Sequence, residues 1–345
     1  MPPAEKRRGA FVISLDLELA WGVRDIYNIH DPYMVRVIHE RRVVPQILEL
    51  FEKYHIGATW AVVGIMFARS RRELEDFSPS LRPQYKNHRL DPYRQSIGEG
   101  EEDDPLHFGY SLIRKIQLAR RQEVATHTFS HYYCLEEGQN RDTFAADLDS
   151  ALALAGKYGI QISSIVFPRN QRNPHYDKVL LDRGIICFRG TENHPAYLAG
   201  SRGDSRLPYK RLYRLIDSHI PLSGFHLTSW GDLMEGSGLY NIPASRYLRP
   251  AESFGFAAGL RLKRIKQAME KAARDKKIFH LWTHPQDFGG APEENLRYLE
   301  TILRHFKRLE EEYGMVSLSM RETALQQITG LDKEVGELWK FNSGI

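Results

Sequence analysis

Short apolar segments alternate with amphipathic segments along most of this chain, and this alternation limits its possible folds more than any other feature. The apolar segments cover residues 10–15, 57–64, 123–126, 163–167, 184–188, 224–229, 278–283 and 314–319. Runs of this length, bounded by turn residues, are typical of buried β-strands. We therefore predict about seven to eight strands.

Four segments between these runs have the apolar spacing of helices. They cover residues 35–55, 141–159, 259–277 and 292–314. Gly159 suits the C-terminal end of the second helix, and Pro292 suits the start of the fourth. Strands that alternate with helices indicate a parallel sheet in an α/β protein. A distorted (β/α) barrel of the TIM type is the predicted fold, and a doubly wound open sheet is the alternative.

Two polar stretches interrupt the alternation. Residues 65–106 and 190–222 are too long to be plain connections, and we interpret both as loop insertions that shape a substrate site. We expect a single barrel over residues 10–330. Residues 1–9 and 331–345 are expected to be tails.

Composition excludes several classes of protein. The formal net charge is only +4, charges of both signs are mixed, and no Lys/Arg stripe is interleaved with aromatic residues, so we expect no nucleic-acid partner. The N-terminal apolar run is broken by Asp16 and makes a poor signal peptide, and no window resembles a membrane span. Cys134 and Cys187 do not form a disulfide framework. A cytoplasmic location is therefore expected.

Polar residues with reactive side chains follow the predicted strands. In a parallel α/β barrel the carboxyl ends of the strands form one face, where the chemistry takes place. The residues at these ends are Asp16, Glu18, His127, His131, Arg169, Arg189 and His284. We predict that they converge on one site.

The histidine pairs need this context to be informative. The chain contains 14 His residues, so a pair with i,i+4 spacing is expected by chance, and His127 and His131 could be an ordinary core or surface pair. His280 and His284 lie on a predicted strand, where this spacing means about 13 Å. Only His284, at the strand end, is therefore a site candidate.

The combined motifs resemble those of the polysaccharide deacetylases with a NodB-homology domain, over roughly residues 10–320. The segment "HTFSH" is similar to that family's His-Ser/Thr-x-x-His motif, and "SLDLE" is similar to its acidic motif. "FPRNQ" resembles its arginine motif, with Pro and Arg in reversed order, and "LWTHP" resembles its late histidine motif. The acidic motif departs from the family pattern because Glu18 stands where Asp is usual.

This resemblance implies a distorted barrel and a metal-dependent amide hydrolase acting on N-acylated sugars. A divalent ion, expected to be Zn²⁺, would be held by Glu18, His127 and His131. Asp16 would act as the general base and His284 as the general acid that protonates the leaving amine. The implied role of Arg169 is to keep Asp16 ionised and oriented.

The substrate is expected to be an N-acylated amino sugar, as a nucleotide sugar or a lipid-linked glycan in surface-polysaccharide assembly. The basic and apolar segment "PYKRLYRLIDSH" (208–219) indicates either contact with the inner membrane or a solvated surface helix. Three alternatives stay open: an N-formyl-sugar deformylase, a cyclic amidohydrolase, and an inactive glycan-binding protein. Trp230 is expected to pack rather than to line a sugar site.

Overall fold

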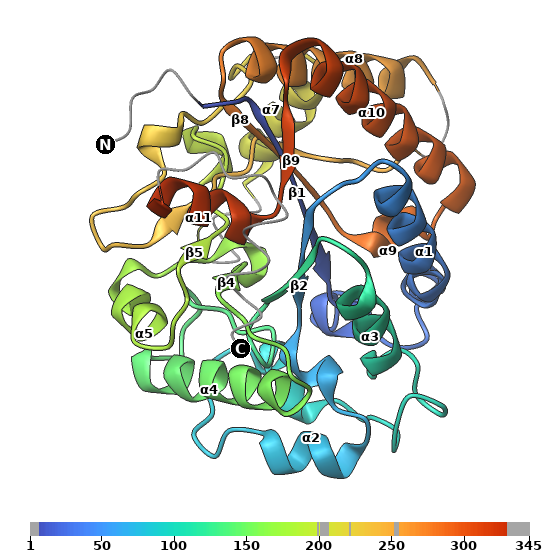
Figure 1. Cartoon of the computed structure of the whole chain (residues 1–345). Helices are drawn as coiled ribbons and strands as arrows, with labels where there is room; N and C mark the ends of the chain where they lie inside the picture. The colour runs from blue at the N-terminus through green and yellow to red at the C-terminus, as the bar shows by residue number, and fades with distance from the viewer. Residues whose placement is uncertain (1–6, 199, 201–206, 221, 252–254, 330–345) are drawn as a thin grey trace.

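The computed structural model describes residues 7–198, 200, 207–220, 222–251 and 255–329. The predicted C-terminal tail and most of the predicted N-terminal tail lie outside these residues, as do residues 199, 201–206 and 221 of the second insertion. The described elements form a curled parallel sheet with helices around its outside (Figure 1).

The strands pair side by side in the order β6-β5-β4-β3-β2-β1-β8-β7, and β9 pairs with the first half of β1. Their bounds are β1 (Ala10–Leu17), β2 (Ala58–Val62), β3 (Gln122–Thr126), β4 (Ser164–Ile165), β5 (Cys187–Phe188), β6 (Tyr240–Asn241), β7 (Arg246–Tyr247), β8 (Ile278–Thr283) and β9 (Val316–Leu318). Every pairing between these strands is parallel.

One extended segment, residues 240–248, closes this sheet into a barrel. Its Ile242 amide donates to the Phe188 carbonyl at 2.9 Å on one side, and its Leu248 amide donates to the Trp282 carbonyl at 2.8 Å on the other. The segment thus connects the edge at β5 to the edge at β8. The predicted distorted (β/α) barrel is confirmed.

Ten helices cover this barrel within the described part of the chain. Their bounds are α1 (Met34–Lys53), α2 (Arg71–Phe77), α3 (Tyr110–Leu118), α4 (Arg141–Lys157), α5 (Asp177–Leu181), α7 (Pro208–His219), α8 (Phe256–Arg274), α9 (Pro285–Phe288), α10 (Pro292–Tyr313) and α11 (Met320–Thr329). All four helices predicted from apolar spacing are present. None of the described helices is long and apolar enough to cross a membrane.

One predicted strand is wrong. Residues 224–229 form no strand and make only a single antiparallel bridge, between Thr228 and Ile278. Gly224 and His226 have φ angles of 84° and 51°, so the backbone turns at both positions instead of extending. The strands of this region are β6 and β7, which were not predicted because residues 240–248 contain no continuous apolar run and Pro243 lies between the two strands.

Successive residues of β1 belong to different layers. Phe11, Ile13, Leu15 and Leu17 point outward into the main hydrophobic core, which the helices cover. Ala10 and Val12 point inward and belong to a smaller core inside the barrel. Because side chains alternate along a strand, the inward face continues through Ser14 to Asp16 at the carboxyl end. Trp230 belongs to the inner core and is buried, as expected for a packing residue.

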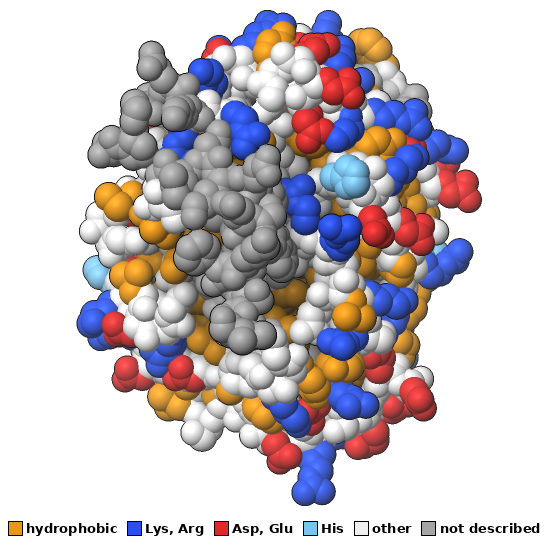
Figure 2. Space-filling model, in the orientation of Figure 1, with side chains coloured by type: hydrophobic (Ala, Val, Ile, Leu, Met, Phe, Trp, Pro, Cys, Tyr) orange, Lys and Arg blue, Asp and Glu red, His pale blue; other side chains and the backbone are white. Residues whose placement is uncertain are grey.

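The first insertion, residues 65–106, packs against the chain that follows β1. The Ala20 amide donates to the Leu106 carbonyl at 3.0 Å, and Arg24 donates to the Leu90 carbonyl at 2.7 Å. The insertion therefore forms a wall near the carboxyl end of β1. On the face shown in Figure 2, the described Lys and Arg side chains are interspersed with Asp and Glu.

Candidate active site and metal centre

A cavity of about 300 Å³ opens at the carboxyl ends of the strands. Its wall includes most of the predicted site residues, together with aromatic side chains. The lining residues are Asp16, Glu18, Gly22, Val23, Tyr33, His131, Arg169, Asn170, Arg189, Tyr247, Trp282, His284, Gln286 and Asp287. The predicted convergence is thus observed, and His127 lies just beneath the cavity, against Glu18.

Glu18, His127 and His131 form one compact cluster. The Oε1 atom of Glu18 lies 2.9 Å from Nε2 of His127 and 3.1 Å from Nε2 of His131, and all three side chains are buried. One carboxylate oxygen and two imidazole nitrogens are a donor set that divalent transition metals bind. The cluster can therefore hold a metal ion.

The hydrogen bonds of His127 favour a cation at this position. Its Nδ1 lies 2.8 Å from the Val166 carbonyl oxygen, which only accepts, so Nδ1 carries the proton. In the neutral ring, Nε2 then directs a lone pair at the Glu18 carboxylate, and a cation between them removes the repulsion. Burial lowers the pKa of the neighbouring His131 to about 4, against a partial opposing effect of Glu18, which disfavours a proton there. The donor set therefore fits a metal ion.

The two histidines do not lie on a helical turn. Thr128 and His131 have φ angles of 64° and 55°, so residues 127–131 form a tight loop after β3. Asp147 of α4 accepts hydrogen bonds from the amides of Phe129 and Ser130 at 2.8 and 3.1 Å. This buried carboxylate fixes the loop and directs both imidazoles toward Glu18.

Tyr133 supports His131 from behind. Its hydroxyl lies 3.1 Å from Nδ1 of His131. The guanidinium groups of Arg24 and Arg169 lie over its ring, 5.3 and 4.8 Å from the centroid. Because Arg24 also donates to the His131 carbonyl at 3.4 Å, these contacts fix both the backbone and the ring of this histidine.

Gly22 makes room for Glu18. A Cβ atom at this position would lie 1.8 Å from Oε2 of Glu18. Only a glycine therefore allows the Glu18 carboxylate its place in the cluster. Gly22, Asp147 and Tyr133 were not predicted, since their roles depend on a three-dimensional approach that leaves no spacing pattern in the sequence.

Asp16 forms a bidentate ion pair with Arg189. Both carboxylate oxygens lie 2.7 Å from guanidinium nitrogens, and Arg189 also donates to Ser14 at 3.0 Å. Burial raises the pKa of Asp16, but Arg189, followed by His127 and His284, outweighs this effect and holds the pKa below its usual value. Asp16 is therefore an ionised carboxylate at neutral pH.

This arrangement corrects the expected partner of Asp16. Arg169 lines the cavity but forms its ion pair with Asp25, and Arg189 takes the place beside Asp16. Both arginines follow strands, but the φ angle of 53° at Arg169 turns the chain within the short helix Pro168–Asn170. Arg189 instead follows Phe188 directly and reaches across the barrel to β1.

His284 directly follows β8, which pairs with β1 on the side away from β2 and β3. Its Nε2 is 3.8 Å from Asp16 and 3.9 Å from Glu18, while its Nδ1 is 3.3 Å from Asp287. Burial lowers the pKa of His284, but Glu18, Asp287 and Asp16 together raise it to about 10. In the metal-free protein the ring is therefore positively charged at neutral pH.

His280 is structural, as the strand spacing predicted. Its Nδ1 contacts the Ile242 carbonyl and its Nε2 contacts Ser14, each at 2.9 Å. Burial lowers its pKa to about 3. Cys134 and Cys187 are both free and buried, away from the cluster of ligand atoms.

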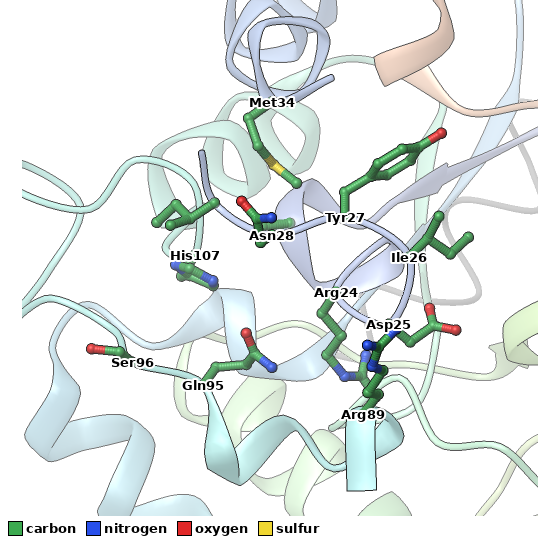
Figure 3. Close-up of a pocket in the computed structure, with 12 residues that line it drawn as sticks. Arg24, Asp25, Ile26, Tyr27, Asn28, Met34, Arg89, Gln95, Ser96 and His107 are labelled. Carbon is green, nitrogen blue, oxygen red and sulfur yellow. The ribbon is translucent and has the colours of Figure 1, made fainter. Parts of the chain in front are cut away.

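A second cavity of about 490 Å³ adjoins the first, between the chain after β1 and the first insertion. Figure 3 shows Arg24, Asp25 and Arg89 on one side of it, and Asn28, Gln95 and His107 on the other. The ring of Tyr27 in this cavity stacks on Tyr33 of the first, 4.3 Å between centroids. The two cavities are thus neighbours.

Solved structures with the same fold are known. A protein from Mycobacterium smegmatis assigned as a polysaccharide deacetylase superposes with a TM-score of 0.58 at 14% identity, covering 95% of this chain and 94% of its own. A second, from Pseudomonas aeruginosa PAO1, gives 0.57 at 9% identity, covering 95% and 93%. The chain has a polysaccharide-deacetylase fold. The family resemblance inferred from the motifs is confirmed at this level.

The deacetylase fold alone does not decide the reaction. A GH57-type branching enzyme from Pyrococcus horikoshii also superposes, with a TM-score of 0.51 at 14% identity, over 91% of this chain and 69% of its own. No family model and no curated protein sequence matches this chain. The side chains of the site must therefore carry the argument for function.

Proposed function

We propose that this chain is a metal-dependent hydrolase that removes an N-acetyl or similar N-acyl group from an amino sugar. The observation that carries the proposal is the Glu18–His127–His131 donor set beside an ionised Asp16 in one cavity. The deacetylase fold supports it. Residues 10–330 would form one functional unit.

Glu18, His127 and His131 would hold the metal ion, for which Zn²⁺ is the expected identity. Bound there, such an ion polarises an acyl oxygen and lowers the pKa of a water molecule. Each histidine ligand has a partner at its Nδ1 atom: the Val166 carbonyl accepts from His127, and the Tyr133 hydroxyl contacts His131. Partners of this kind fix the ring orientation of metal ligands.

Asp16 would accept the proton of the attacking water as general base. Arg189 keeps Asp16 ionised, and its two-pronged contact fixes the direction of the carboxylate. The role of keeping Asp16 ionised and oriented was expected for Arg169. Arg169 remains a proposed site residue, since it lines the same cavity.

His284 would donate a proton to the leaving nitrogen. An amine leaves poorly unless it is protonated, so a charged imidazole near the reacting bond supplies the missing proton. Asp287 contacts the Nδ1 atom of His284, which leaves Nε2 of the same ring directed toward Asp16 and Glu18.

The substrate is proposed to be a sugar within surface-polysaccharide or lipid-linked glycan assembly, with a nucleotide sugar as the other form. Tyr33, Tyr247 and Trp282 give the cavity aromatic walls, which suit the apolar faces of sugars. The adjoining cavity has room for a further sugar unit, with the amides of Asn28 and Gln95 as partners for hydroxyl groups. Two free, buried cysteines fit the expected reducing cytoplasm.

The test combines metal analysis with product analysis. The native protein should contain about one divalent ion per chain, and His127→Ala should contain none. Acetate released from an N-acetylhexosamine conjugate would support the proposal, whereas formate or a ring-opened ureide would indicate the deformylase or the cyclic amidohydrolase. Asp16→Asn should bind sugar without turnover. Sugar binding with no turnover in the native protein would indicate a glycan-binding protein.

A further inference from the structure

The Tyr247 hydroxyl extends the contact between His284 and Asp287 to a third side chain. It donates to Oδ2 of Asp287, and the same oxygen lies 3.3 Å from Nδ1 of His284. A carboxylate oxygen only accepts hydrogen bonds, so Nδ1 of His284 carries a proton. Burial, followed by the Asp287 carboxylate, raises the pKa of Tyr247 well above its usual value, so the hydroxyl also keeps its proton. One oxygen of Asp287 thus accepts from a phenol and an imidazole.

The three side chains are brought together by the closing of the barrel. Tyr247 belongs to β7, within the extended segment 240–248 that connects the two edges of the sheet. Its register partner on β8 is Trp282, two residues before His284. Asp287 lies on the short helix α9, which follows β8. The closing segment therefore supplies a hydroxyl to the side chains around the proposed general acid.

Tyr247 determines where the Asp287 carboxylate points. The backbone of Asp287 is fixed, because its amide donates to the His284 carbonyl at 3.0 Å. Its carboxylate can still rotate, since the terminal torsion of an aspartate is broad. Among the described side chains, Tyr247 and His284 are the two that hydrogen-bond to this carboxylate. Without the Tyr247 hydroxyl, Oδ2 of Asp287 would have no second group to keep it facing His284.

The orientation of the His284 ring depends in turn on Oδ2 of Asp287. With Nδ1 held there, Nε2 lies 3.8 Å from the carboxylate of Asp16. The rings of Trp282 and Tyr247 pack edge-on against His284, at centroid distances of 5.5 and 5.9 Å. These packing contacts limit the space around the ring but do not distinguish Nδ1 from Nε2. The hydrogen bond to Asp287 makes that distinction.

We propose that Tyr247 is a positioning residue, which acts through Asp287 to hold Nε2 of His284 at the leaving nitrogen of the substrate. The inference rests on the proposed function, in which His284 is the general acid. In that step the C–N bond breaks, an N–H bond of the amine product forms, and the Nε2–H bond of His284 breaks. The ring is left neutral, with its remaining proton on Nδ1 toward Asp287. Tyr247 should therefore matter most for substrates that release an amine.

Tyr247→Phe tests the proposal, because it removes the hydroxyl and keeps the aromatic wall. Two probes are compared: an N-acetylhexosamine conjugate, whose amine must be protonated to leave, and p-nitrophenyl acetate, whose phenolate leaves without a proton. The ratio of kcat for the amide to kcat for the ester should fall about tenfold or more, as for the loss of one hydrogen bond to a charged group. Tyr240→Phe is the matched control and should keep the native ratio, since Tyr240 lies in the same segment but does not line the catalytic cavity.

A double variant shows whether Tyr247 acts through Asp287. If it does, Tyr247→Phe/Asp287→Asn should hydrolyse the amide no more slowly than Asp287→Asn alone, since the effects of coupled residues are not additive. An unchanged ratio in Tyr247→Phe, or additive losses in the double variant, would overturn the proposal. The first result would assign Tyr247 to the aromatic wall alone, and the second would give it a role separate from Asp287.

NMR of the Nδ1–H proton of His284 in the chelator-treated protein tests the arrangement without turnover. The signal is assigned by its loss in His284→Gln. In Tyr247→Phe it should broaden through faster exchange with water, because Asp287 is no longer fixed as its acceptor, and an unchanged signal would overturn the proposal. If the signal changes but the native protein hydrolyses no amide, the positioning of His284 stands and the deacetylase is refuted. Amide hydrolysis with an unchanged signal would do the reverse.

Discussion

Arg189 binds both carboxylate oxygens of Asp16, each at 2.7 Å, from a strand that is separated from β1 by three others. The pair joins two sides of the barrel directly at the reaction site. The guanidinium also lies 4.4 Å from the centre of the Trp282 ring, which fixes it in place. Fold and proposed chemistry therefore depend on the same contact.

Replacing Arg189 should shift the acid limb of the pH–rate profile. Asp16 must be ionised to act as a base, so activity falls as pH drops through its pKa, which Arg189 lowers. In Arg189→Lys the bidentate contact is lost, so the pKa of Asp16 should rise. The acid limb of the profile should then move to higher pH, and kcat should fall. The dependence of kcat/KM on pH measures this. Arg169→Lys is the control, and an equal shift in both variants would contradict the assignment.

Gly22→Ala should abolish metal binding without unfolding the protein. The added methyl group would occupy the position of the Glu18 carboxylate, which must then leave the cluster. Metal content per chain and the thermal midpoint together check this. Gly156→Ala is the matched control, since nothing lies within 4 Å of its added Cβ and α4 should gain about 0.5–1 kcal/mol. Full metal content in Gly22→Ala would argue against Glu18 as a ligand.

Tyr133→Phe should weaken the metal site while preserving its shape. The ring keeps its contacts with Arg24 and Arg169, but His131 loses the hydroxyl partner at Nδ1. Loss of such a partner typically reduces metal affinity about 10- to 100-fold. Competition with a chelator gives the affinity. Tyr132→Phe, whose hydroxyl contacts Thr143 instead, should bind metal normally, and similar losses in both variants would indicate a general packing effect.

His284 should titrate near pH 10 in the chelator-treated protein, as followed by NMR of its ring protons. Its folded pKa lies above the usual value of about 6.5, so its contribution to stability is complete below pH 6.5. That contribution is lost as pH rises toward 10. The stability difference between native protein and His284→Gln should therefore shrink over this range. Asp287→Asn should lower the pKa, and an unchanged pKa would exclude this ion pair as a cause.

The sequence was sufficient for much of the site because strand residues alternate. Asp16 lies near the carboxyl end of β1, and His127, Arg189 and His284 directly follow β3, β5 and β8. All four occupy inward-facing positions, so their convergence follows once the strands are parallel. Strands β6 and β7 escaped prediction because polar residues and Pro243 interrupt residues 240–248, which therefore contain no apolar run.

Other features depend on how distant segments meet. The curling of the sheet places β5 across from β1, so that Arg189 and not Arg169 reaches Asp16. The order of the strand ends along the sequence does not predict this contact. Likewise, apolar spacing identifies the two faces of α7 but does not tell which one packs inward. The buried partners of Asp217 make that choice.

The alternation of β1 also restricts how this chain can evolve. Inserting or deleting one residue between Val12 and Asp16 would exchange the two faces of the strand. Leucines would then enter the cavity, and the Asp16 carboxylate would be forced into the main hydrophobic core beneath the helices. Point substitutions can change either face separately, but the length of this strand is fixed for as long as the reaction is retained. Descendants of this chain should therefore vary in the loops and keep an unbroken β1.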